Sequence, residues 1–131
     1  MGRSVSIKCQ KCGYNASLNL GAGMMFSNPN VIISMFDKEL QEKISPLITG
    51  PQKAAFDASK ELGICQKCKK AESVPVVRIT PPGSSPITYR PTCSCGQDFV
   101  LYNTDGWDGE PNVPCPVCGN TLDIENIGLW D

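Results

Sequence analysis

Apolar and polar residues follow two different periods along the first half of the chain. They alternate over residues 4–8 and again over residues 14–20, which predicts two short strands because successive side chains of a strand point to opposite faces. Between residues 31 and 44 the apolar positions recur every three or four residues, which predicts an amphipathic helix. Ser27-Asn28-Pro29 places a capping residue before a first-turn proline, so we expect the helix to begin there and to end at Pro46. The apolar positions of this helix are Val31, Ile32, Met35, Phe36, Leu40 and Ile44.

A second, shorter helix is predicted directly after the first. Thr49-Gly50-Pro51 has the composition of a helix start, and Gly63 fits the position just beyond a helix end. The two predicted helices form a helical hairpin over residues 29–62. The apolar residues assigned to the second helix are Ala54, Ala55, Phe56, Ala58 and Leu62.

The second half of the chain has the pattern of short strands joined by turns. Residues 74–79 and 86–90 flank a turn-rich segment. Five prolines fall between residues 75 and 91, so this stretch is either an edge hairpin or a semi-rigid linker. Residues 99–102 and 121–124 are two further predicted strands. The pattern therefore predicts a small α+β protein with a thin core.

Cysteine composition changes this picture, because the chain has eight cysteines and no histidine. A glycine follows three of the close cysteine pairs, where a positive φ lets backbone amides point at the sulfurs. Four such pairs supply two closed Cys₄ metal sites, for which zinc is the favoured ion and iron the alternative. A disulfide framework would need an oxidising compartment, and CxxC pairs rarely close on themselves. The pairs are Cys9 and Cys12, Cys65 and Cys68, Cys93 and Cys95, and Cys115 and Cys118.

Loop length favours joining the cysteine pairs in the order in which they occur, because shorter closed loops cost less entropy. Site 1 is then Cys9, Cys12, Cys65 and Cys68, and site 2 is Cys93, Cys95, Cys115 and Cys118. An interleaved pairing remains open. On this partition, residues 1–73 form a zinc ribbon with the helical insert. Residues 74–131 form a proline-rich hairpin or linker followed by a C-terminal zinc ribbon.

The knuckles also resemble those of known families. Cys93-x-Cys95-Gly96 and Cys115-Pro-Val-Cys118-Gly119 are similar to the paired knuckles of zinc ribbons, a likeness that covers residues 90–125 and implies metal but no function. The whole chain, with Cys9-Gln-Lys-Cys12-Gly13-Tyr14 before a Gly-Ala-Gly-Met segment, resembles an uncharacterised family of small, mainly Gram-positive bacterial double zinc-ribbon proteins. That resemblance implies the fold and two zinc ions. Rubredoxins have similar knuckles, and a resemblance to them implies iron as the metal. The long insert and the two extra cysteine pairs of this chain depart from the rubredoxin pattern.

Several function classes are excluded or disfavoured by composition. Without histidine there is no Ser-His-Asp or Cys-His catalysis, and no other catalytic constellation stands out, so we expect no enzyme and no small-molecule substrate. The net charge is −1, and no apolar run reaches the roughly 18 residues of a membrane span. The N-terminus is too polar for a secretory signal. We therefore expect a cytoplasmic protein without a membrane partner.

The distribution of charge leaves three hypotheses. Residues 1–73 carry ten of the twelve basic residues and only six acidic ones, so a nucleic-acid interface is one hypothesis. The alternative is that lysines offset the charge of about −2 on each Zn(Cys)₄ centre, in which case the module binds another protein, our favoured hypothesis. A thiol–zinc redox switch is the third. Trp107 and Trp130 would be protein-contact anchors if exposed. The lysines around the first knuckles are Lys8, Lys11, Lys67, Lys69 and Lys70.

Overall fold

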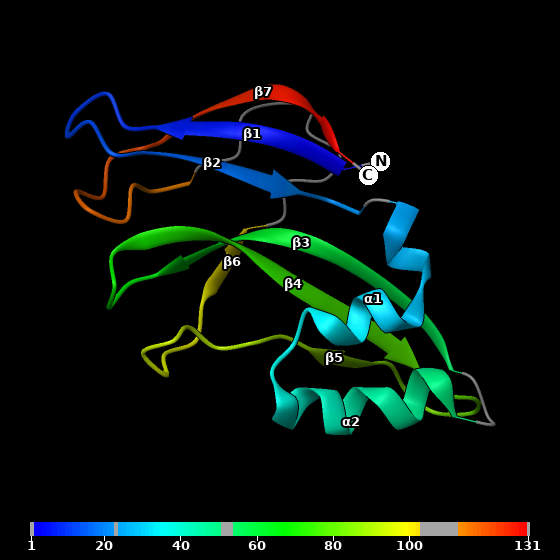
Figure 1. Ribbon diagram of the computed structural model, residues 1–131. Coiled ribbons are helices and arrows are strands. Elements are labelled where there is room, and N and C mark those ends of the chain that lie inside the picture. Colours follow the sequence, from blue (N-terminus) through cyan, green and yellow to red (C-terminus); the bar gives the residue numbers. More distant parts are fainter. Residues whose placement is uncertain (1, 23, 51–53, 103–112, 131) are drawn as a thin grey trace.

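The strands form two antiparallel sheets, of three and four strands, with two helices beside the larger one (Figure 1). The structure is a computed structural model and describes residues 2–22, 24–50, 54–102 and 113–130. It is a small, mostly β member of the α+β class. In chain order the elements are β1 (Gly2–Lys8), β2 (Asn15–Leu20), the 3₁₀ turn η1 (Met24–Ser27), α1 (Pro29–Ser34), α2 (Lys38–Thr49), β3 (Ala55–Cys65), β4 (Lys70–Thr80), β5 (Ile87–Tyr89), β6 (Val100–Tyr102) and β7 (Asp123–Trp130).

The three-stranded sheet joins the two ends of the described chain. Its order is β2-β1-β7, so the N-terminal strand lies between its hairpin partner and the C-terminal strand. Ile7 faces Ala16 on one side and Ile124 on the other. The alternation over residues 4–8 and 14–20 is confirmed as strand, whereas the predicted strand at 121–124 begins two residues later and continues to Trp130.

The four-stranded sheet has the order β5-β4-β3-β6 and is built on the long β3–β4 hairpin. The helix predicted up to Leu62 is wrong, because β3 occupies residues 55–65. Ala58 and Leu62 are four apart, a spacing that suits one face of a strand as well as one face of a helix. Their burial, together with that of Ile64, follows the two-residue period. Eleven residue pairs with β4 override the local helix propensity.

Gly63 lies in the interior of β3 and does not end a helix. A Cβ added there would collide with the Val74 side chain and would come within 3.3 Å of Leu101 and Phe99. The glycine therefore allows β3 to pack closely against the side chains of Val74, Phe99 and Leu101.

We expect Gly63→Ala to lower the free energy of unfolding of the metal-loaded protein by about 1–3 kcal/mol, because overpacking forces neighbours out of place. Gly128→Ala is the matched control, since an added Cβ there meets no atom within 4 Å. Urea unfolding measures both variants. Equal stability of the two variants would contradict this packing.

The helical region holds two short helices in place of the predicted long one. The Asn28 side chain accepts a hydrogen bond from the Asn30 amide at 3.0 Å, which confirms the predicted start of α1. The break after α1 has a local cause, because the Asp37 carboxylate accepts from the Leu40 amide at 2.9 Å and caps a new helix. Pro46 lies inside α2, which continues to Thr49. The predicted end at that proline is therefore wrong.

Buried side chains connect the two sheets. Val5, Ile7 and Leu20 from the three-stranded sheet form one core cluster with Leu62 and Ile64 from the four-stranded sheet. The predicted boundary between residues 73 and 74 falls inside β4.

A second cluster holds the helices against the other end of the four-stranded sheet. Ile44 and Ile48 of α2 pack there with Val77 and Ile79 of β4. In the part of the chain that the structure describes, no helix has the length and apolarity needed to cross a membrane.

Candidate metal centres

The eight cysteines form two groups of four, but not the groups that loop length predicted. The outer centre consists of Cys9, Cys12, Cys115 and Cys118, and the inner centre consists of Cys65, Cys68, Cys93 and Cys95. The first pair therefore joins the last, and the two middle pairs join each other. The sequential partition into sites 1 and 2 is wrong.

Strand pairing explains this nested arrangement. In each centre one cysteine pair forms the turn of a hairpin, β1–β2 or β3–β4, and the other pair precedes a strand that pairs with the first strand of that hairpin. β7 pairs with β1, and β6 pairs with β3. The chain thus contains an outer ribbon (β1, β2 and β7) and an inner ribbon (β3, β4 and β6) inserted within it. The sequence showed this arrangement for the first pair, which lies between the predicted strands at residues 4–8 and 14–20, but not for the second pair, because the residues before it were predicted to be helical.

The sulfur atoms of each centre are placed as the ligands of a single ion would be. In the outer centre the Cys9 and Cys118 sulfurs are 3.4 Å apart, and those of Cys12 and Cys115 are 3.6 Å apart. All four sulfurs of each centre lie within 4.8 Å of one another. Metal–thiolate bonds of about 2.3 Å in a tetrahedron require sulfurs about 3.8 Å apart. The four-sulfur set of the outer centre therefore fits a tetrahedral metal ion.

The inner centre has the same geometry. The Cys65 and Cys95 sulfurs are 3.6 Å apart, and those of Cys68 and Cys93 are 3.7 Å apart. These distances far exceed the roughly 2.05 Å of a disulfide bond, and all eight cysteines are free. Both centres can hold a metal ion.

The turns that carry the cysteines have the expected backbone conformation. Gly13, Gly96 and Gly119 have φ of 81°, 89° and 81°, and each donates its amide to the carbonyl of the first cysteine of its knuckle at 2.8–3.0 Å. Backbone amides also point at sulfur, since Val117 N–H donates to Cys115 Sγ at 3.4 Å. The glycines therefore allow each tight turn to present two sulfurs on one side.

Lys69 occupies the same position in the remaining knuckle, which sequence analysis did not recognise. Its φ is 55°, and it is the one residue other than glycine with positive φ in the described parts of the chain. Its amide donates to the Cys65 carbonyl at 2.9 Å, as the glycines do in their turns. One knuckle of the inner centre thus has a backbone conformation that is unfavourable for any residue other than glycine.

We expect Lys69→Val to destabilise the metal-loaded protein by about 1–2 kcal/mol, because a β-branched residue is strongly disfavoured at positive φ. Lys69→Gly is expected to be at least as stable as the wild type. Lys67→Val, in the same exposed turn, controls for the lost charge. Thermal unfolding of the three variants distinguishes them, and a Lys69→Val protein as stable as Lys67→Val would refute the conformational explanation.

One thiol of each centre is more acidic than an ordinary cysteine. A hydrogen bond from the Cys95 backbone amide lowers the pKa of Cys93 to about 6. At the outer centre the Asn120 side chain donates to Cys118 Sγ at 3.3 Å, and this bond with the Asn120 backbone amide lowers the pKa of Cys118 to about 6. The thiolate form is therefore favoured at these two sulfurs.

The opposite shift affects a second thiol in each centre. A backbone hydrogen bond from Tyr14 favours the Cys12 thiolate, but desolvation and the neighbouring thiols outweigh it and raise the pKa of Cys12 to about 12. Hydrogen bonds with Cys95 and Cys93 raise the pKa of Cys68 to about 12. Metal uptake at neutral pH must displace these protons, because thiolates and not thiols are the ligands.

All four knuckles lie at the same end of the molecule (Figure 1). The predicted lysines therefore gather there, with Lys8 and Lys11 at the outer centre and Lys67 and Lys69 at the inner centre, all exposed. Lys70 differs, because it pairs with Glu72 at 3.1 Å, which raises the pKa of Lys70. Trp107 and the side chain of Trp130 lie outside the described residues.

Comparison with protein-family models, with curated proteins and with solved structures gives no match for this chain.

Proposed function

We propose that the protein is a structural zinc protein that binds another protein and has no catalytic role. The observation that carries this proposal is the pair of closed four-sulfur sets, each joining a hairpin turn to a distant knuckle. A centre with four protein ligands has no open position for water or substrate, so its metal serves the fold. The resemblance to double zinc-ribbon proteins supports the same conclusion.

Zinc is the proposed ion because soft thiolates in a tetrahedral set suit zinc, with iron the alternative. Metal analysis of the natively purified protein tests this proposal, and we expect two zinc ions per chain. A red, iron-loaded protein would refute it and would favour electron transfer.

A protein partner is favoured by exposed apolar residues on β7. Ile127 is 55% exposed and Leu129 is 65% exposed. β7 is at the edge of its sheet and, among the described strands, pairs only with β1. Exposed apolar side chains on an unpaired strand edge are typical of surfaces that accept a strand or an apolar patch of another protein.

Variants of this strand test the proposed surface. The double variant Ile127→Asp, Leu129→Asp should lose any protein that the zinc-loaded wild type retains on an affinity matrix. Ile87→Asp is the matched control, because Ile87 is 40% exposed on the other sheet. If the double variant and the Ile87→Asp variant both lose the partner, or both retain it, the assignment to β7 is contradicted.

Nucleic acid is the second candidate, favoured by the four exposed lysines at the knuckle end. Two Zn(Cys)₄ centres of about −2 each would offset those charges, so we expect no binding of single-stranded or duplex DNA by the zinc-loaded protein at low salt. Salt-dependent binding that weakens in Lys8→Glu and Lys67→Glu variants would favour nucleic acid over protein.

A further inference from the structure

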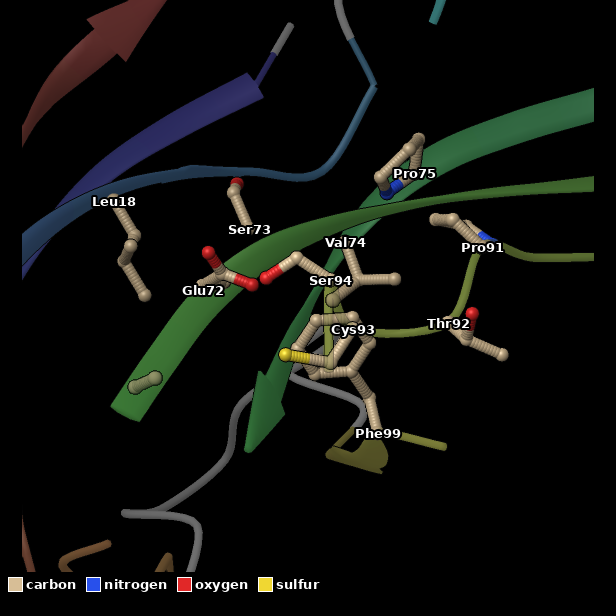
Figure 2. Close-up of a pocket in the computed structure, with 11 residues that line it drawn as sticks. Leu18, Glu72, Ser73, Val74, Pro75, Pro91, Thr92, Cys93, Ser94 and Phe99 are labelled. Carbon is tan, nitrogen blue, oxygen red and sulfur yellow. The ribbon is translucent and has the colours of Figure 1, made fainter. Parts of the chain in front are cut away.

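A pocket of about 370 Å³ lies beside the inner centre, between β4, β2 and the segment that leads into Cys93 (Figure 2). Its floor is apolar, because Val74 and Phe99 are 1% and 7% exposed and belong to the cluster that supports Cys93. Leu18 of β2 and two prolines, Pro75 and Pro91, complete the apolar walls.

The polar groups of the pocket are oxygens. Glu72 and Ser94 line the pocket with their side-chain oxygens, and Thr92 lies on the other side of Cys93 (Figure 2), whereas the Ser73 hydroxyl donates to the Asn19 carbonyl of β2. Apart from Cys93, Glu72 is the one ionisable residue among those that line it. A loaded four-thiolate centre at Cys93 would add further negative charge. The pocket therefore combines an apolar floor with a rim that carries one carboxylate, which also pairs with Lys70.

One edge of β4 is open at this pocket. β5 pairs with Val77–Ile79 alone, so at residues 72–75 no described strand pairs with β4 on the side opposite β3. An extended segment of another protein could lie along this edge and place a side chain in the pocket, as in strand addition.

We propose that this pocket takes an arginine or lysine side chain from an extended segment of a protein partner. The aliphatic stem packs on Val74 and Phe99, and the cationic head meets the Glu72 carboxylate and the Ser94 hydroxyl. The proposal rests on the protein-binding function proposed above and names a recognition element of the partner.

The contact between Lys70 and Glu72 is consistent with this assignment. Lys70 Nζ lies 3.1 Å from Oε1 of Glu72, and both side chains are about two-fifths exposed, at 38% and 41%. The carboxylate therefore already binds one ammonium group at the surface. A carboxylate can accept several hydrogen bonds, so Glu72 can bind the proposed guanidinium or ammonium beside Lys70.

The experiment uses the zinc-loaded full chain and N-acetyl-arginine-N-methylamide as the probe. The matched neutral probe is the citrulline analogue, which keeps the shape and loses the charge. We expect the arginine probe to shift the amide signals of Val74, Ser94 and Phe99 in two-dimensional NMR titrations. Glu72→Gln should weaken this binding about fivefold, the effect of losing one partly exposed ion pair.

Asp98→Asn is the matched control, because Asp98 is an exposed carboxylate near the inner centre that does not line the pocket. It should leave the affinity unchanged. Equal binding of the citrulline probe, an equal loss in Asp98→Asn, or no shift at these amides would each overturn the proposal. None of these outcomes affects partner capture through Ile127 and Leu129, so failure here is distinguishable from failure of the proposed function.

Discussion

Chelation of the metal is expected to abolish the tertiary structure of the whole chain. A structural zinc in a small domain contributes about 10–16 kcal/mol of apparent folding free energy, whereas a domain of this size has a net stability of about 5–15 kcal/mol. Cys9, Cys65, Cys93 and Cys115 are at most 3% exposed, so loss of the ion leaves thiols or uncompensated thiolates inside the core clusters.

Near-ultraviolet circular dichroism and thermal melting measure the effect, before and after incubation with a strong zinc chelator. The control is the same chelator saturated with zinc, and re-addition of zinc should restore both signals. An unchanged melting transition in the metal-free protein would show that the clusters around Leu62 and Ile44 fold without the centres.

Paired cysteine variants are expected to show which knuckles share an ion. Cys12, Cys68 and Cys118 are exposed, so serine at these positions removes a ligand without opening a cavity in the core. In the nested arrangement, Cys12→Ser with Cys118→Ser disables the outer centre alone and leaves one zinc per chain. Cys12→Ser with Cys68→Ser disables both centres and leaves none.

Sequential pairing of the knuckles makes the opposite prediction for both double variants. It would leave one zinc in the Cys12, Cys68 variant and none in the Cys12, Cys118 variant. Metal analysis after gel filtration therefore separates the two arrangements without a structure determination. The stability losses provide a second readout, because changes within one centre should be strongly non-additive.

Local patterns predicted the features that depend on short segments. The alternation around Val5 and Leu18 predicted strands, and Asn28 before Pro29 predicted the start of α1. The glycines after Cys12, Cys95 and Cys118 predicted tight knuckles, and all three of these glycines have the expected positive φ. Each of these features involves residues only a few positions apart, so its physical cause is contained in the segment itself.

The sequence by itself determined that this protein has eight cysteines in four close pairs, enough to hold two metal ions. Only the tertiary structure decided which knuckles meet and that residues 55–65 form a strand. Loop-closure entropy favours the pairing of knuckles that are neighbours in the sequence, but the entropic cost grows slowly with loop length. The pairing of β1 with β7 and of β3 with β6 outweighs it. Those contacts join residues far apart in the chain, and their strength comes from side chains that no local pattern brings together.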